Sequence, residues 1–449
     1  MGKGHYQGIT LVLLGVALYG CPIDDAQVGD PGSSSSGAGA SGGMAASSSS
    51  GSGAGGTGGV GGTGGGGTGG MGGVGGTGGM TSSSSSGSGG MGGCPVEPGL
   101  PGSCDTPGCP ACPALVMFAT GIQGGITKRF QTKDGWTTET AVSDKSTDPP
   151  AFVIIPGQKA GVALLRSSEG ATKDRIRASA WTEATGFGPL TNMGSTATTR
   201  ATPGIATSAT AAHIVYQDVN NSRYWYAAYT PAAGFAPTNE EVKVGALYSL
   251  GNAAAAITVL GADPIITNDG WNDPNLYTQR RAAGTWEASA SHAMGYDVDD
   301  STPAIAALAQ GPELVVVFPR ATDKQLFFLT RTAGTWSTTP ATITGANSTE
   351  SALLVLPAGG ALLVFRDAST GDLHWSRFDG TTFSAAENLT WKALGRPALA
   401  LGAGDAEAEL VYVDTTGKAQ HSRLQNGAFT TPVLVGGTNL AGVAIATNL

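Results

Sequence analysis

The chain has 449 residues, of which 72 are glycine, and its formal net charge at pH 7 is −9. Because no run of basic residues offsets this acidity, the sequence lacks the electrostatic signature of nucleic-acid binding, and we expect no nucleic-acid partner. Residues 31–93 contain 30 glycines and 16 serines but no charged or aromatic side chain. That stretch cannot bury enough apolar surface to offset its chain entropy, which excludes a domain there.

Residues 1–20 have the features of a secretory signal. Lys3 precedes a mostly apolar run, Ile9–Leu18, that is too short to span a bilayer. The sequence L-Y-G-C at Leu18–Cys21 resembles a bacterial lipobox, and the resemblance implies that Cys21 becomes the lipidated N-terminus. The alternative is an ordinary signal peptide with a chance cysteine. We expect secretion across the inner membrane and a lipid anchor, at the outer membrane or cell surface of a Gram-negative bacterium.

Two segments follow the lipobox before the folded core begins. Residues 21–93 are predicted to be a flexible Gly/Ser-rich tether, and residues 94–113 a Cys- and Pro-rich segment. Four thiols in a secreted chain favour two structural disulfides, for which three pairings are possible. A zinc site and a redox-active pair remain alternatives, because two of the cysteines are separated by only two residues. The four cysteines are Cys94, Cys104, Cys109 and Cys112.

A short phrase recurs from Leu115 to the end of the chain. It is a glycine followed directly, or after one or two small residues, by an aromatic residue. Successive aromatics are 46 to 51 residues apart. A sustained period of this size is typical of a propeller or a solenoid. The seven aromatics are Trp136, Phe187, Phe235, Trp286, Trp336, Phe383 and Phe429.

The content of each repeat is β. Within residues 302–338, four short segments alternate with turns that carry Gly, Pro, Asp and Thr. No stretch has a long 3.6-residue apolar period, which excludes a helical repeat. Residues 114–449 are therefore predicted to form an all-β, seven-bladed β-propeller with four-stranded blades. We expect the small-residue strands to line the centre and the repeated aromatics to pack between blades.

The two ends of the repeat region are out of phase with each other. Ala114–Ala119 matches the second strand of a blade, whereas Leu440–Ala446 matches a first strand. We therefore expect the N- and C-terminal strands to close one blade together. Closure of this kind removes the exposed edges of an open ring.

The stretch Gly371–Ser384 resembles the repeat unit of bacterial seven-bladed propeller lectins, and its shape is similar to blades of the six-bladed fucose-specific lectins. The resemblance implies carbohydrate binding between blades. In the fucose-specific family an arginine of the second strand and a glutamate of the third bind the sugar. Here the second-strand positions are apolar, as at Leu363 and Leu410, so that pocket is not predicted. The third-strand positions hold Gln279, Leu329, Trp375 and His421.

An arginine recurs three or four residues before the repeated glycine. One interpretation is a ring of hydrogen-bond donors for sugar hydroxyls or carboxylates. The other is a cation–π or turn-capping contact with the aromatic of the next strand. The four arginines are Arg281, Arg331, Arg377 and Arg423.

Two further places are candidate ligand sites. The loop with Asp269, Trp271 and Asp273 offers carboxylates and an indole for a sugar or Ca²⁺, although turn formation is the favoured explanation of an aspartate at a strand end, such as Asp269. Trp375 beside His374 is a candidate stacking surface, with core packing as the alternative. No cofactor and no metal are predicted.

We expect a lectin-like surface protein whose partners are glycans or surface proteins, held at the membrane by its lipid. A protein-interaction scaffold without a small ligand is the alternative, and a glycan hydrolase or lyase is less favoured. The chain has no S-x-D-x-G-x-x-W box, G-x-S-x-G elbow or paired-carboxylate motif, so it is not expected to be an enzyme.

Overall fold

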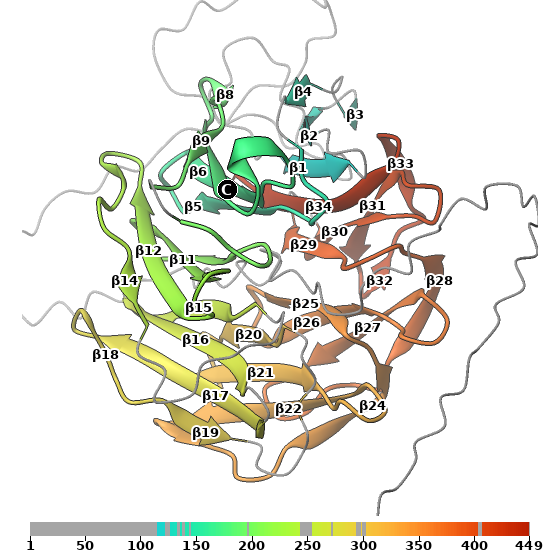
Figure 1. Ribbon diagram of the computed structural model, residues 1–449. Coiled ribbons are helices and arrows are strands. Elements are labelled where there is room, and N and C mark those ends of the chain that lie inside the picture. Colours follow the sequence, from blue (N-terminus) through green and yellow to red (C-terminus); the bar gives the residue numbers. More distant parts are fainter. Residues whose placement is uncertain are drawn as a thin grey trace, which may run out of the picture. The chain divides into compact units, whose positions relative to one another are not determined.

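A computed structural model describes most of the chain from Leu115 onward (Figure 1). The predicted signal, tether and disulfide segment lie outside the described residues, together with Cys21, Cys94, Cys104, Cys109 and Cys112, and these assignments stay predictions. The described residues are 115–121, 126–132, 135–136, 140–142, 145–194, 197–242, 254–270, 273–292, 298, 302–402 and 406–448.

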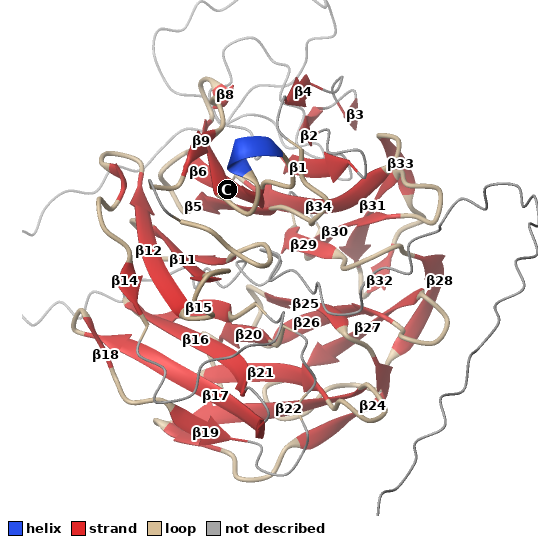
Figure 2. Ribbon diagram, in the orientation of Figure 1, coloured by secondary structure: helices blue, strands red, loops and turns tan. Residues whose placement is uncertain are grey.

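Strands supply nearly all the regular structure of the described residues (Figure 2). They pair into seven antiparallel sheets, numbered here in chain order. Sheet 1 joins both ends of the domain and holds β1 (Leu115–Gly121), β2 (Ile126–Thr132), β3 (Gly135–Trp136), β4 (Thr140–Val142) and β34 (Leu440–Thr447). Sheet 2 holds β5 (Ala151–Ile155), β6 (Ala160–Arg166), β7 (Ile176–Thr182), β8 (Gly186–Phe187) and β9 (Thr191–Asn192).

The middle sheets repeat this arrangement. Sheet 3 holds β10 (Gly204–Thr207), β11 (Ala212–Gln217), β12 (Tyr224–Thr230), β13 (Gly234–Phe235) and β14 (Glu240–Glu241). Sheet 4 holds β15 (Ala256–Leu260), β16 (Asp263–Gly270), β17 (Asp273–Ala282), β18 (Thr285–Trp286) and β19 (Ala290–His292). Sheet 5 holds β20 (Ala304–Ala307), β21 (Leu314–Pro319), β22 (Gln325–Thr332), β23 (Thr335–Trp336) and β24 (Ala341–Asn347).

The last two sheets complete the series. Sheet 6 holds β25 (Glu350–Val355), β26 (Ala361–Arg366), β27 (Asp372–Phe378) and β28 (Glu387–Lys392). Sheet 7 holds β29 (Ala398–Leu401), β30 (Ala408–Val413), β31 (Ala419–Gln425), β32 (Ala428–Phe429) and β33 (Val433–Gly436).

The first strands of the sheets contact one another in a closed circuit. Going round it, β5 contacts β10, then come β15, β20, β25, β29 and β34, and β34 contacts β5 again. Figure 1 shows the same succession, with the colours running from green through yellow and orange to red, and with β34 beside β1. The predicted all-β propeller fold is confirmed.

Sheet 1 contains the predicted closure. β34 pairs antiparallel with β1 from Leu115↔Thr447 to Gly121↔Leu440. β34 takes the innermost place and β1 the second, which is the phase expected from the sequence. The pairing of the two chain ends is therefore confirmed, and it leaves neither β34 nor β1 as an unpaired inner edge.

Small residues lie where the first strands crowd together. β10 reads G-I-A-T, β20 A-I-A-A and β29 A-L-A-L, and nearly all these side chains are buried. A Cβ at Gly204 would lie 2.5 Å from the carbonyl oxygen of Ala255, which immediately precedes β15 of the next sheet. The close approach of the neighbouring backbone therefore requires a glycine at position 204, while other first strands, such as β5 with A-F-V-I-I, hold larger side chains.

The repeated glycine marks the turn from the third strand to the fourth. Gly284 and Gly334 have φ of +84° and +82°, a left-handed conformation that residues with a Cβ adopt at a cost. The turn places the following aromatic opposite the end of the third strand. Arg281 pairs with Trp286 in this way, and Arg331 pairs with Trp336.

Helical structure is minor in the described part of the chain. The helix η2 (Gly170–Thr172) is a single 3₁₀ turn. None of the helices found among the described residues has the length and apolar character to cross a membrane.

Candidate functional site

The repeated aromatics lie between neighbouring sheets. Each packs in the apolar cluster that joins its own sheet to the preceding one, as Trp336 does among residues of sheets 4 and 5. The prediction that these rings pack between blades is confirmed. The other members are Trp136, Phe187, Phe235, Trp286, Phe383 and Phe429, each in a different cluster.

The described residues of sheets 4 and 5 leave a hollow beside the aromatic of their interface. The cavity between sheets 4 and 5 has a volume of about 170 Å³, and we call it the open cleft. Apolar groups line part of it, and hydroxyl, amide, guanidinium and carboxylate groups line the rest. The lining residues are Ile265, Thr278, Gln279, Arg280, Glu287, Ala288, Ala290, Leu314, Arg331, Gly334 and Trp336.

Arg331 supplies hydrogen-bond donors to the open cleft. Its Nη1 donates to Glu313 Oε2 at 3.0 Å, and the same oxygen accepts from the backbone N–H of Gly334 at 3.1 Å. A guanidinium has five N–H donors, so one ion pair to Glu313 does not exhaust them. The ion pair thus holds the arginine in place while leaving donors for a ligand.

Trp336 forms an aromatic wall supported by His292. The two ring centroids are 4.8 Å apart, and His292 Nε2 lies 2.8 Å from the hydroxyl of Thr278. Burial, with the positive charge of Arg331, lowers the pKa of His292 to about 4. The imidazole is therefore neutral at neutral pH, which leaves the charges of the cleft to Arg280, Arg331 and Glu287.

In the equivalent space between sheets 3 and 4, the ring of Tyr226 lies 5.5 Å from that of Trp286. Tyr226 and Thr278 both lie three residues before the one that pairs with the fourth-strand aromatic, so they are equivalent positions. Tyr226 pairs with Glu240, whereas Thr278 pairs with Ala290. The open cleft therefore exists because a threonine and an alanine replace a tyrosine and a glutamate.

Aromatic rings fill two other interfaces. Between sheets 5 and 6, the ring of Phe328 lies 5.1 Å from that of Phe383. Between sheets 6 and 7, Trp375 is 8% exposed and packs 5.7 Å from Phe429. The role of Trp375 in ligand stacking stays a prediction, and its burial fits the core-packing alternative.

The interface between sheets 7 and 1 holds a buried charge cluster that the sequence reasoning missed. Glu409 is fully buried, and its carboxylate binds Arg423 Nε at 3.2 Å and His421 Nε2 at 2.8 Å. The His421 ring in turn packs 5.5 Å from Trp136. In the sequence, the feature that could have predicted this cluster is the single carboxylate, Glu409, within the otherwise apolar strand Ala408–Val413.

The four recurring arginines do not form a uniform ring of free donors, because each pairs with a glutamate. Arg281 reaches Glu240 of the preceding sheet, and Arg377 reaches Glu407, just before β30 of the following one. Arg331 and Arg423 pair with Glu313 and Glu409 of their own sheets. Of the four, Arg331 lines the open cleft. Arg281 does make a cation–π contact, with its Cζ 5.1 Å from the centre of the Tyr226 ring, but that ring belongs to the preceding sheet and not to the strand that follows Arg281.

The acidic loop predicted as a second site is only partly described. Asp269 is buried near the end of β16, and Asp273 begins β17. Trp271 lies outside the described residues. No group of three or more His, Cys, Asp or Glu side chains in the described part of the chain is placed to hold a metal ion.

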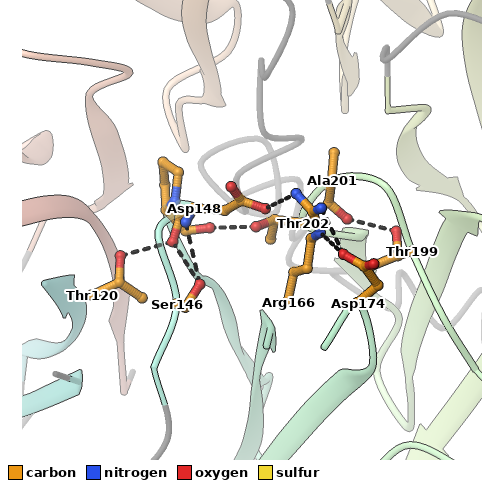
Figure 3. A network of polar contacts seen from close by, with 9 residues as sticks. Thr120, Ser146, Asp148, Arg166, Asp174, Thr199, Ala201 and Thr202 are labelled. Carbon is orange, nitrogen blue, oxygen red and sulfur yellow. Dashed lines mark hydrogen bonds and ion pairs between the residues drawn. The ribbon is translucent and has the colours of Figure 1, made fainter. Parts of the chain in front are cut away.

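A separate polar network lies where second strands end, whereas the open cleft lies near the start of the second strand β21 (Figure 3). Arg166, the last residue of β6, binds Asp174 through Nη2 at 2.7 Å and Asp148 through Nη1 at 3.2 Å. The hydroxyl of Thr120 in sheet 1 donates to the backbone oxygen of Asp148 at 2.8 Å, and Thr202 donates to that of Pro149 at 2.5 Å. The network therefore links sheets 1, 2 and 3.

Burial raises the pKa of the Asp148 carboxyl, and the positive charge of Arg166 partly opposes this rise. A related pair recurs in sheet 6, where Arg366 Nη1 lies 3.3 Å from Glu350 Oε2. Because Arg166 is occupied by two carboxylates, the network of Figure 3 has the character of a structural brace.

No family model and no curated protein matches this chain. Solved structures do share its fold. A candidate 6-phosphogluconolactonase from Bacteroides uniformis is 12% identical, with 74% of this chain and 99% of that chain covered and a TM-score of 0.50. A protein from Lactobacillus plantarum is 10% identical, with coverages of 74% and 99% and a TM-score of 0.50. A Hadza microbial sialidase is 11% identical, with coverages of 68% and 74% and a TM-score of 0.48.

These similarities correct the expectation that the protein is not an enzyme. Proteins that share this fold carry enzyme names, among them the candidate 6-phosphogluconolactonase. The propeller fold is therefore compatible with an enzyme, and the absence of three sequence motifs does not exclude catalysis. At these identities the similarity establishes the propeller fold and says nothing of substrate.

Proposed function

We propose that the protein binds a carbohydrate in the open cleft between sheets 4 and 5. The observation that carries the proposal is the set of groups around one cavity: the Trp336 ring, the donors of Arg331 and the carboxylate of Glu287. A sugar ring has apolar C–H faces and a rim of hydroxyls that both donate and accept hydrogen bonds. An aromatic wall beside a donor and an acceptor matches both properties.

The volume indicates how much of a glycan enters. About 170 Å³ is smaller than the pockets of roughly 300–1,000 Å³ that hold drug-sized ligands. The cleft therefore has room for one sugar residue, and the remaining sugars of the glycan would lie outside it. This size favours recognition of a terminal or branch residue of a glycan.

Equivalent positions in neighbouring sheets provide the test. Thr278→Tyr combined with Ala290→Glu introduces the pair that fills the preceding interface, so it closes the cleft with groups already accommodated by this fold. We expect the double variant to lose glycan binding by about tenfold or more while keeping its melting temperature. Binding is measured on a glycan array and then by calorimetry with the full chain.

Ala341→Glu is the matched control. Ala341 pairs with Phe328 and so stands in sheet 5 where Ala290 stands in sheet 4, at an interface that rings already fill. This variant should bind like the wild type. If the wild type binds no glycan on the array, the proposal is wrong and the scaffold alternative is favoured. If the double variant binds a glycan normally, the site lies elsewhere.

We also infer that each of the seven sheets is one blade and that the propeller is presented from a membrane. The lipobox-like L-Y-G-C and the Gly/Ser-rich residues 21–93 support an anchor at Cys21 followed by a tether. Disulfides among the four cysteines of residues 94–113 would stiffen the attachment. Mass spectrometry of the mature N-terminus tests the anchor. Acyl chains on Cys21, and release of the protein by Cys21→Ser, are the expected results.

A further inference from the structure

We infer that the interface between sheets 3 and 4 is a second carbohydrate site of the same kind, held shut by Tyr226 and Glu240. We call this interface the closed cleft. The inference rests on the proposed function of the open cleft, since the ligand class is taken from it. It adds a second site and names the two side chains that block it.

The closed cleft repeats the aromatic and the arginine of the open one, whereas Ala236, which follows Phe235 as Glu287 follows Trp286, stands in place of the Glu287 carboxylate. Trp286 takes the place of Trp336, and Arg281 pairs across the ladder with Trp286 as Arg331 does with Trp336. An acidic residue lies at the start of the second strand in both sheets. It is Asp263, the first residue of β16, in one and Glu313, directly before β21, in the other. Glu313 binds Arg331, whereas Asp263 binds Arg280, the neighbour of Arg281.

Two side chains occupy the space that a ligand would need. The Tyr226 ring lies 5.5 Å from Trp286, edge to face, and Arg281 Cζ lies 5.1 Å above the Tyr226 ring. Glu240 Oε2 then accepts from Arg281 Nε at 3.0 Å across the interface. The phenol covers the indole, and the carboxylate takes the donor that a sugar would use.

The two blocking residues are held differently. The ion pair is partly exposed, with side-chain exposures of 26% for Arg281 and 38% for Glu240, so water screens it and it holds the cleft weakly. Tyr226 is 6% exposed, and its hydroxyl lies 2.6 Å from Nδ1 of the buried His213. The tyrosine is therefore the stronger block, and the wild-type chain should bind one ligand, in the open cleft.

The experiment introduces the small residues of the open cleft into the closed cleft. Tyr226→Thr with Glu240→Ala gives the closed cleft the small pair of the open one. Calorimetry on the full chain, with the sugar selected by the array, should give a stoichiometry of one for the wild type and two for this variant. Adding Thr278→Tyr and Ala290→Glu should return the number to one, now bound at the former closed cleft.

A folded Tyr226→Thr/Glu240→Ala variant that still binds one sugar per chain overturns the inference. If the wild type binds no sugar, the proposed function has failed, and a crystal structure of the opened variant decides this inference separately. A cavity lined by Trp286 and Arg281 supports an equivalent cleft. Collapse of sheets 3 and 4 onto each other refutes it.

Discussion

The stability of the protein should depend on pH through His213, a residue beneath the closed cleft. His213 is 8% exposed, and its ring nitrogens lie 2.6 Å from the Tyr226 hydroxyl and 3.1 Å from the Ser208 hydroxyl. Burial, with the positive charge of Arg281, lowers its pKa from 6.5 to about 4. The folded protein therefore keeps the imidazole neutral at pH values where the unfolded chain protonates it.

The direction of the effect follows from proton binding. Between about pH 4 and 6.5 the unfolded state binds more protons at His213 than the folded state, so stability falls as the pH falls. Relative to pH 7, this pKa difference lowers the free energy of unfolding by ~2 kcal/mol at pH 5 and ~3 kcal/mol at pH 4. His213→Gln removes the titrating group. The variant should therefore gain stability relative to the wild type as the solution is acidified.

Urea unfolding followed by circular dichroism at pH 4, 5, 6 and 7 measures this difference. At pH 7 the variant should be less stable by ~1 kcal/mol, the contribution of a typical hydrogen bond, and the order should reverse at pH 4. Tyr226→Phe is the control, because it keeps His213 and its cover and so should keep the wild-type pH dependence. A wild-type-to-variant difference that is equal at pH 4 and pH 7 would show that His213 titrates alike in both states and would refute the reasoning.

Two further predictions concern buried groups. Glu409→Ala leaves Arg423 and His421 without their shared carboxylate, and it should lower the free energy of unfolding by about 3–5 kcal/mol in urea, with a smaller loss for Glu409→Gln. An equal loss for both variants would argue against the charge of Glu409 as the cause. Gly360 has φ of +73°, and a Cβ there would lie 2.0 Å from the Phe378 carbonyl oxygen. Gly360→Ala should therefore cost more than the ~1–3 kcal/mol of backbone strain alone, and an unchanged melting temperature would contradict the close approach.

The architecture was predictable from the sequence because its signals are local and repeated. A turn needs a left-handed residue at one place, so Gly284 and Gly334 recur, and the aromatic after each has one place to pack. The phase of Leu115 and Leu440 predicted the closure of sheet 1, because a propeller leaves no inner edge unpaired. These features depend on residues that are close in sequence or on the period itself.

The partners of the arginines were not predictable in the same way. Arg281, Arg331 and Arg377 look alike in the sequence, yet they pair with a preceding, an own and a following sheet respectively. A long guanidinium at the rim of a strand reaches in several directions. The nearest carboxylate therefore decides the pairing, and it can lie about 40 residues away, as Glu240 does from Arg281.

The candidate site shows where sequence and tertiary structure divide. The sequence alone determined an all-β repeat, its period, its closure and the ring of aromatics, since each follows from local turn chemistry and strand phase. Only the tertiary structure decided that the interface between sheets 4 and 5 is open. That outcome depends on Thr278 and Ala290 of sheet 4, which line the same cavity as Trp336 of sheet 5. In the preceding interface, Tyr226 and Glu240 take the corresponding places beside Trp286. A cavity is the volume that side chains from different strands fail to fill, and no single segment encodes it.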